Sequence, residues 1–90
     1  MSEPLTIDVQ ETPNPQAVKL TLNRVIAATG TTYRNAGSAD AAWAKELLGI
    51  PGVIQVFAVN NFVSVTKVPE AQWESVIPRA ERVLRDAFGA

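Results

Sequence analysis

The sequence contains neither cysteine nor histidine among its 90 residues. A chain without thiols forms no disulfide and offers no thiolate to a metal, a cluster or a substrate, and a chain without imidazole lacks the commonest general base. These absences exclude most enzyme classes. We therefore predict a protein that is not an enzyme and that holds no cofactor of its own.

The sequence also has no excess of charge and no long apolar run. Eight basic side chains stand against nine acidic ones, for a net charge of −1, so no strong positive field is available for a nucleic acid. No apolar run approaches the roughly 20 residues that cross a bilayer, and the amino terminus lacks a basic segment followed by an apolar one. We expect a cytoplasmic protein that binds neither nucleic acid nor membrane.

The apolar content that is present is that of a folded chain. Hydrophobic residues make up 47% of the sequence and charged residues 19%. The length suits one compact domain over residues 1–90, without a second one. Such a small domain can leave little apolar surface exposed without a use for it.

The first third of the sequence predicts two paired strands. Apolar and polar residues alternate over 5–9 and again over 18–22, which is typical of strands with one buried face. Between them, Pro13 and Pro15 exclude a strand and restrict the residues that precede them. We expect a stiff loop that joins the two strands and presents a fixed shape.

A short strand over 31–33 and then a helix follow. The helix is expected to start after Ser38, with Asp40 in its first turn, and to stop at Gly49 and Pro51. Its residues Trp43, Ala44, Leu47 and Leu48 share one side, which should face the sheet.

The clearest hairpin joins strands 53–59 and 62–67 through Asn60 and Asn61, which tolerate the geometry of a type I′ turn. In this register Val59 faces Phe62. One face carries the predicted core residues Ile54, Val56, Ala58, Val63 and Val65. The other carries Gln55, Phe57, Val59, Phe62, Ser64 and Thr66.

An amphipathic pattern predicts a second helix from Pro69 onward, and leaves open whether that helix is continuous through Pro78. The predicted fold class is α+β. We expect a two-layer sandwich with a mixed, mostly antiparallel sheet of four to five strands and two helices on one face, in the order ββ(β)αββα.

Two groups of residues are candidates for a function. The acidic pairs Asp8 with Glu11 and Glu70 with Glu74 could act together or hold an ion, but surface acids without a role fit the pattern better. Phe57 and Phe62 should lie side by side on the face away from the core. Such a patch indicates either a structural cover, for example the first hairpin or a loop, or a partner surface, and we favour the cover.

The segment Glu11-Thr12-Pro13-Asn14-Pro15, followed by Lys19, resembles the opening signature of the N-terminal domain of Nfu/NifU-type scaffold proteins. The resemblance continues over nearly the whole chain. Its further matches are Ala44, Leu47, Leu48, Ile50, Gly52, Val53, Val56, Phe57, Phe62, Val63, Val65, Thr66, Lys67 and Trp73. Two departures are Ala41-Ala42-Trp43 in place of Ser-Pro-Leu, and Asn61 where aspartate is common.

The resemblance implies a link to iron–sulfur cluster biogenesis, in which full-length relatives carry the cluster on a second domain with a CxxC motif. Without cysteine, this chain is expected to act as a non-catalytic protein-interaction module for a CxxC scaffold or a target protein. The predicted partner-binding residues are Thr12, Pro13, Asn14, Pro15, Lys19, Phe57, Asn61 and Phe62. Two alternatives stay open: a small-molecule or iron-ion binder that uses oxygen ligands, and a self-associating structural subunit. The sequence does not decide between monomer and dimer.

Overall fold

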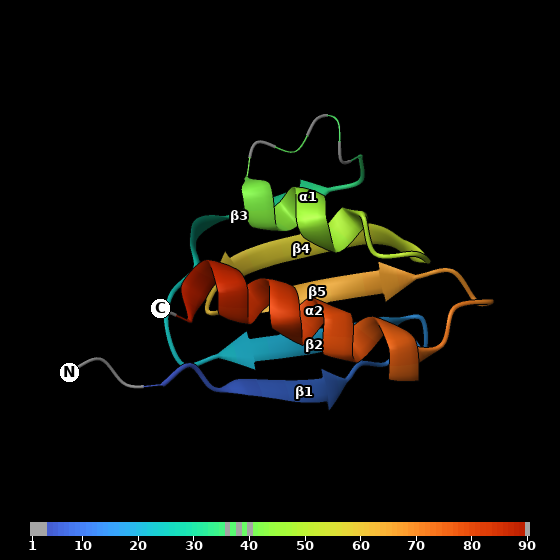
Figure 1. The fold of residues 1–90 in the computed structure, drawn as a ribbon, viewed down its shortest axis with the longest axis horizontal. Helices are drawn as coiled ribbons and strands as arrows, with labels where there is room; N and C mark the ends of the chain where they lie inside the picture. The colour runs from blue at the N-terminus through green and yellow to red at the C-terminus, as the bar shows by residue number, and fades with distance from the viewer. Residues whose placement is uncertain (1–3, 36, 38, 40, 90) are drawn as a thin grey trace.

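A computed structural model describes residues 4–35, 37, 39 and 41–89 of the chain. Five strands and two helices follow one another along it (Figure 1). They are β1 (Ile7–Glu11), β2 (Ala17–Leu22), β3 (Ala27–Tyr33), α1 (Ala42–Leu48), β4 (Val53–Asn60), β5 (Phe62–Lys67) and α2 (Trp73–Phe88). None of the described helices is long and apolar enough to span a membrane.

The strands form one sheet in the order β1-β2-β5-β4-β3, and each of its neighbouring pairs is antiparallel. Both helices lie on the same face of this sheet, with α1 over the β4 side and α2 crossing β5 and β2 (Figure 1). The predicted α+β sandwich is confirmed. The third strand, which the sequence predicts over 31–33, is present and longer, spanning Ala27–Tyr33.

The β4–β5 hairpin has the predicted register, with Val59 opposite Phe62 and Val56 opposite Val65. The predicted type I′ turn is wrong, because that turn needs a positive φ at both central residues. Of the described non-glycine residues, Asn60 alone has one, at 53°. Asn61 instead ties the turn to β2: its side-chain Nδ2 donates to the Leu22 carbonyl at 3.1 Å, and its own carbonyl accepts from the Leu22 N–H at 2.7 Å.

The prediction that Ile54 lies in the core is wrong. The register shifts between Val53, which pairs with Lys67, and Gln55, which pairs with Thr66. Ile54 is the extra residue of this irregularity, and its side chain is 49% exposed, whereas Val53 is only 8% exposed. A bulge of this kind moves the residues before it to the opposite face.

Both helices begin later than the capping signals predict. The first begins at Ala42 with Ala41 as its N-cap, and the second begins at Trp73 with Gln72 as its N-cap; neither cap makes a side-chain hydrogen bond. Ser38 and Asp40 lie outside the described residues. Pro69 and Glu70 precede the second helix instead of opening it, and that helix is continuous through Pro78.

The core lies between the sheet and the helices. The largest fully buried side chains come from both layers: Leu20, Leu47, Leu84, Val56, Val63, Val65 and Val76. Burying a side chain of this size contributes about 1.5–3 kcal/mol each, so the two apolar helix faces are held on the sheet mainly by this layer. The predicted sheet-facing side of α1 is confirmed, with Ala44 and Leu47 buried and Trp43 and Leu48 packed against the core.

Candidate functional site

The loop between β1 and β2 is held by its own hydrogen bonds. The Thr12 hydroxyl oxygen lies 2.9 Å and 3.0 Å from the carbonyl oxygens of Asn14 and Ala17, and it accepts a hydrogen bond from the Asn14 N–H. The Asn14 side chain in turn accepts from the Gln16 N–H at 3.0 Å. Together with the two prolines, which fix their own φ angles, these contacts give the loop the stiffness that the sequence predicts.

The start of α2 packs against this loop. Trp73 is the first residue of the helix, and its indole Nε1 donates to the Pro15 carbonyl at 3.3 Å. Beneath it lies Lys67, which is only 6% exposed. The Lys67 ammonium donates to Gln16 Oε1 at 2.9 Å and lies 5.2 Å from the centre of the Trp73 ring. The loop, the end of β5 and the start of α2 therefore form one connected unit.

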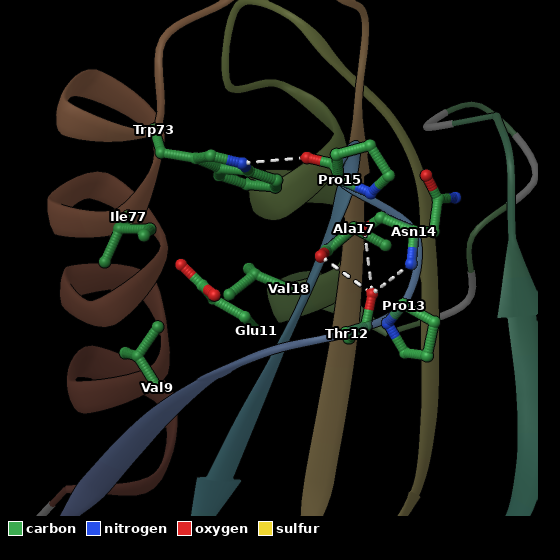
Figure 2. Close-up of a pocket in the computed structure, with 10 residues that line it drawn as sticks. All are labelled: Val9, Glu11, Thr12, Pro13, Asn14, Pro15, Ala17, Val18, Trp73 and Ile77. Carbon is green, nitrogen blue, oxygen red and sulfur yellow. Dashed lines mark hydrogen bonds between the residues drawn. The ribbon is translucent and has the colours of Figure 1, made fainter.

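A pocket of about 510 Å³ opens between this loop, β1, β2 and α2 (Figure 2). Its walls are mostly apolar. The lining residues are Val9, Glu11, Thr12, Pro13, Asn14, Pro15, Ala17, Val18, Trp73 and Ile77. Glu11 is the one charged residue among them, and Figure 2 shows its carboxylate pointing from β1 toward α2. The pocket suits an apolar group with a positive charge beside it.

Phe57 and Phe62 lie on the other face of the sheet, as predicted. Their ring centres are 6.2 Å apart, and the Lys19 ammonium lies 4.5 Å above the Phe62 ring. Both helices are on the opposite face (Figure 1), and the first hairpin, one of the covers considered from the sequence, is instead the edge pair of the same sheet. Both rings are half-buried, and Phe57 packs beside Gly30 of β3, where an added Cβ would come within 3.3 Å of the ring.

The structure thus divides the predicted partner-binding residues into three places. Thr12, Pro13, Asn14 and Pro15 line the pocket, and Lys19, Phe57 and Phe62 share the open face of the sheet. Asn61 sits at the other end of β5 from the loop and holds the hairpin turn to β2. Its observed role is structural.

The acidic pairs do not form. Asp8 and Glu11 are three residues apart on one strand, so their side chains leave opposite faces of the sheet. Glu70 precedes the first turn of α2, so it does not share a helix face with Glu74. Within the described part of the chain, no group of three or more acidic side chains is placed to hold a metal ion.

Trp73, Ile77, Val9 and Glu11 belong to the pocket, and the sequence alone did not identify them as site residues. The four-residue spacing of Trp73 and Ile77 predicts a common helix face, and the amphipathic pattern of this helix predicts that this face packs on the core. The sequence favours a surface acid at Glu11, and this residue is exposed. No local pattern indicates that this helix face extends beyond the core to the loop.

The fold and the pocket define a small two-layer α+β domain with a cleft beside a loop that is held by its own hydrogen bonds. Residues 7–90 match the family model described as "Scaffold protein Nfu/NifU N terminal". The chain belongs to this family, as its loop signature indicated.

Relatives and solved structures agree with this assignment. The chain is 30% identical over 80 residues to "Conserved virulence factor C" of Staphylococcus aureus, covering 88% of this chain and 21% of the relative. It is 31% identical over 87 residues to "NFU1 iron-sulfur cluster scaffold homolog, mitochondrial" of Drosophila willistoni, covering 93% of this chain and 30% of that protein. The chain therefore spans less than a third of either curated relative.

The crystal structure of the Staphylococcus aureus protein SAV1430 is similar over 87% of this chain and 96% of that one, with a TM-score of 0.78 and 35% identity. The solution structure of a NifU-like protein from Saccharomyces cerevisiae has a TM-score of 0.83 at 20% identity, covering 96% of this chain and 82% of that one. This second likeness shows the fold alone.

Proposed function

We propose that this domain is a non-catalytic docking module in iron–sulfur cluster assembly or delivery, and that its partner carries the cluster. The proposal rests on the pocket of about 510 Å³. Four loop residues of the family signature, those at positions 12–15, line this pocket together with Trp73. The sequence supplies no cysteine, so thiolate ligation of a cluster falls to the partner.

The residues that line the pocket are held in place, so a partner can bind there at a low entropic cost. Thr12 and the two prolines hold the loop in one conformation, and the Trp73 indole is fixed by its hydrogen bond to Pro15. Groups that are already ordered lose little freedom when a partner binds, so more of the contact energy appears as affinity. Trp73 is also a tryptophan, one of the residue types that are enriched where the binding energy of protein interfaces is concentrated.

Affinity capture from the cells that produce the protein tests this function. The bait is the tagged chain, and the partner recovered is identified, purified and titrated against the bait by calorimetry. We expect a CxxC-bearing scaffold or an iron–sulfur target protein. A bait that binds no protein of cluster biogenesis under these conditions contradicts the proposal.

Two tryptophan variants show whether the pocket is the docking site. Trp73→Leu removes the wall of the pocket and the bond to Pro15, and should weaken binding of the purified partner by about tenfold or more, as for a buried aromatic contact. Trp43→Leu is the matched control, because Trp43 also lies in the first turn of a helix and is half-buried but packs on Tyr33 and Phe88 instead. Equal losses in the two variants would mean that the pocket is not the docking site.

A further inference from the structure

β1 is an edge strand with one unpaired side. The Leu22 N–H and carbonyl both bond to Asn61, so the backbone of Leu22 points toward β5. Backbone groups alternate in direction along a strand, so those of Thr21 and Lys19, one and three residues before Leu22, point toward β1. They bond to the backbone groups of Asp8 and Gln10, respectively. The backbone groups of Ile7, Val9 and Glu11 therefore point outward, and no described residue bonds to them there.

Two of these three residues, Val9 and Glu11, also line the pocket. Ile7 and Val9 pack against the core on the helix side, and Val9 and Glu11 line the pocket beside Trp73 and Ile77. The row of unpaired N–H and carbonyl groups and the apolar cleft are thus adjacent parts of one surface. The other edge strand, β3, differs because its register shifts between Ala27 and Thr31. Such an irregularity disrupts the row of groups that a further strand would need.

We propose that an extended segment of the partner pairs antiparallel with β1 as a sixth strand of the sheet. Its residue opposite Val9 is apolar and enters the pocket against Trp73, and its residue opposite Glu11 is lysine or arginine. These two positions are two residues apart on the partner, so the recognised motif is basic-x-apolar. Strand addition of this kind takes affinity from main-chain hydrogen bonds and specificity from alternate side chains. The inference rests on the proposed docking function and names the chemistry of its partner.

Charge favours such a segment over a second copy of this chain. Glu11 is the one charged side chain in the pocket lining, and it makes no ion pair or hydrogen bond with the described residues. A second β1 would present only Ile7, Val9 and Glu11 on the pocket side. None of these is basic, so both Glu11 carboxylates would stay unpaired in a dimer. A basic residue in the partner gives the favourable cross-strand pair.

A peptide library gives the first test. Seven-residue peptides with a threonine background carry random residues at three alternate positions and are selected on the immobilised domain. We expect enrichment of lysine or arginine two positions before an aliphatic residue. Selection of no motif, or of a motif without a basic residue, overturns the proposal.

A charge exchange on β1 tests the role of Glu11. Glu11→Lys should weaken binding of the selected peptide by about threefold to tenfold, and a peptide with glutamate in place of its basic residue should recover it. Asp8→Lys is the matched control, because it makes the same change on the same strand but on the other face. It should leave the preference unchanged. A Glu11→Lys domain that still prefers the basic peptide contradicts the assigned pairing.

Hydrogen exchange followed by NMR tests the backbone pairing. In the complex, the amides of Ile7, Val9 and Glu11 should exchange at least about tenfold more slowly, while Asp8 and Gln10, already bonded to β2, should change little. A peptide that shifts the Trp73 indole signal without protecting these amides docks by its side chains only. A concentration-dependent dimer that excludes the peptide identifies a second copy as the occupant. Either outcome overturns strand addition.

These outcomes are separate from those of the proposed function. If the library and the exchange experiment succeed but no protein of cluster biogenesis is captured, the strand-addition surface stands and the cellular assignment fails. If such a protein is captured but its affinity falls with Phe62→Thr and not with Glu11→Lys, the module docks through the open face and the strand-addition inference fails.

Discussion

Gly52 connects α1 to β4 and sets the position of the segment that leads into α2. Its φ is +96°, a conformation that residues with a Cβ rarely adopt. Its carbonyl accepts from the Val68 N–H at 2.8 Å, and a Cβ added at Gly52 would overlap the side chain of Ala71. Ala71 lies two residues before Trp73, so a change here reaches the wall of the pocket.

The cost of Gly52→Ala has two parts. The left-handed backbone costs about 1–2 kcal/mol in a residue with a side chain, and a methyl group without space adds about 1–3 kcal/mol. We therefore expect a loss of about 2–5 kcal/mol in the free energy of unfolding. For a domain of this size each kcal/mol lowers Tm by about 4–8 °C, so even the smaller value lowers Tm by about 8–16 °C.

Thermal and urea unfolding of three variants measure this cost. Gly49→Ala is the matched control, because Gly49 has a helical φ of −77° and its added Cβ would meet its nearest neighbours at an ordinary 3.4 Å. It should change stability by less than about 1 kcal/mol. Ala71→Gly combined with Gly52→Ala should recover the steric part, which keeps the test informative if the single variant does not fold. The reasoning is refuted if Gly52→Ala is as stable as Gly49→Ala.

Three further substitutions test the loop, the turn and the core. Thr12→Val removes the hydroxyl that accepts from the Asn14 N–H and should lower the free energy of unfolding, measured in urea, by about 0.5–1.5 kcal/mol. Thr6→Val, at an exposed position, should lower it by less. Equal losses would mean that the Thr12 hydrogen bonds do not stabilise the loop. Asn60→Val should lower the free energy of unfolding by about 1–2 kcal/mol because φ at this position is 53°, whereas Asn60→Gly should not lower it. Comparing the Tm values of the two variants tests this. Leu84→Ala should cost about 3–5 kcal/mol, and a loss below about 1 kcal/mol would mean that Leu84 is not in the packed core.

The pairing of β4 with β5 could be predicted because strict alternation and a two-residue connection leave one register. The same alternation misplaced Ile54. Val53 and Ile54 are equally apolar, so the pattern reads the same whether or not an extra residue interrupts the strand. The bulge depends on the pairing with Thr66 and Lys67 on β5, which is a property of two strands together.

The helix starts were mispredicted because neither N-cap is a residue type that typically caps a helix. Ala41 and Gln72 have extended backbones and make no side-chain cap. Two residues further upstream, the polar Ser38 and Pro69, supplied misleading start signals. Trp43 is the second residue of α1 and Trp73 the first of α2, and both pack against the core. Tertiary packing therefore overrides local capping preferences at both starts.

The candidate site could be predicted only in part, and the reason lies in the strand order. The signature of loop 12–15 and its stiffness are local properties, but the partner wall comes from Trp73, which is 58 residues away from Pro15 in the chain. β5 lies between β2 and β4, and the Lys67 N–H at its end bonds to the Gln16 carbonyl. The chain thus leaves the sheet beside the loop, and α2 has to begin there. The pocket follows from this central place of the last strand, which no local pattern in the sequence specifies.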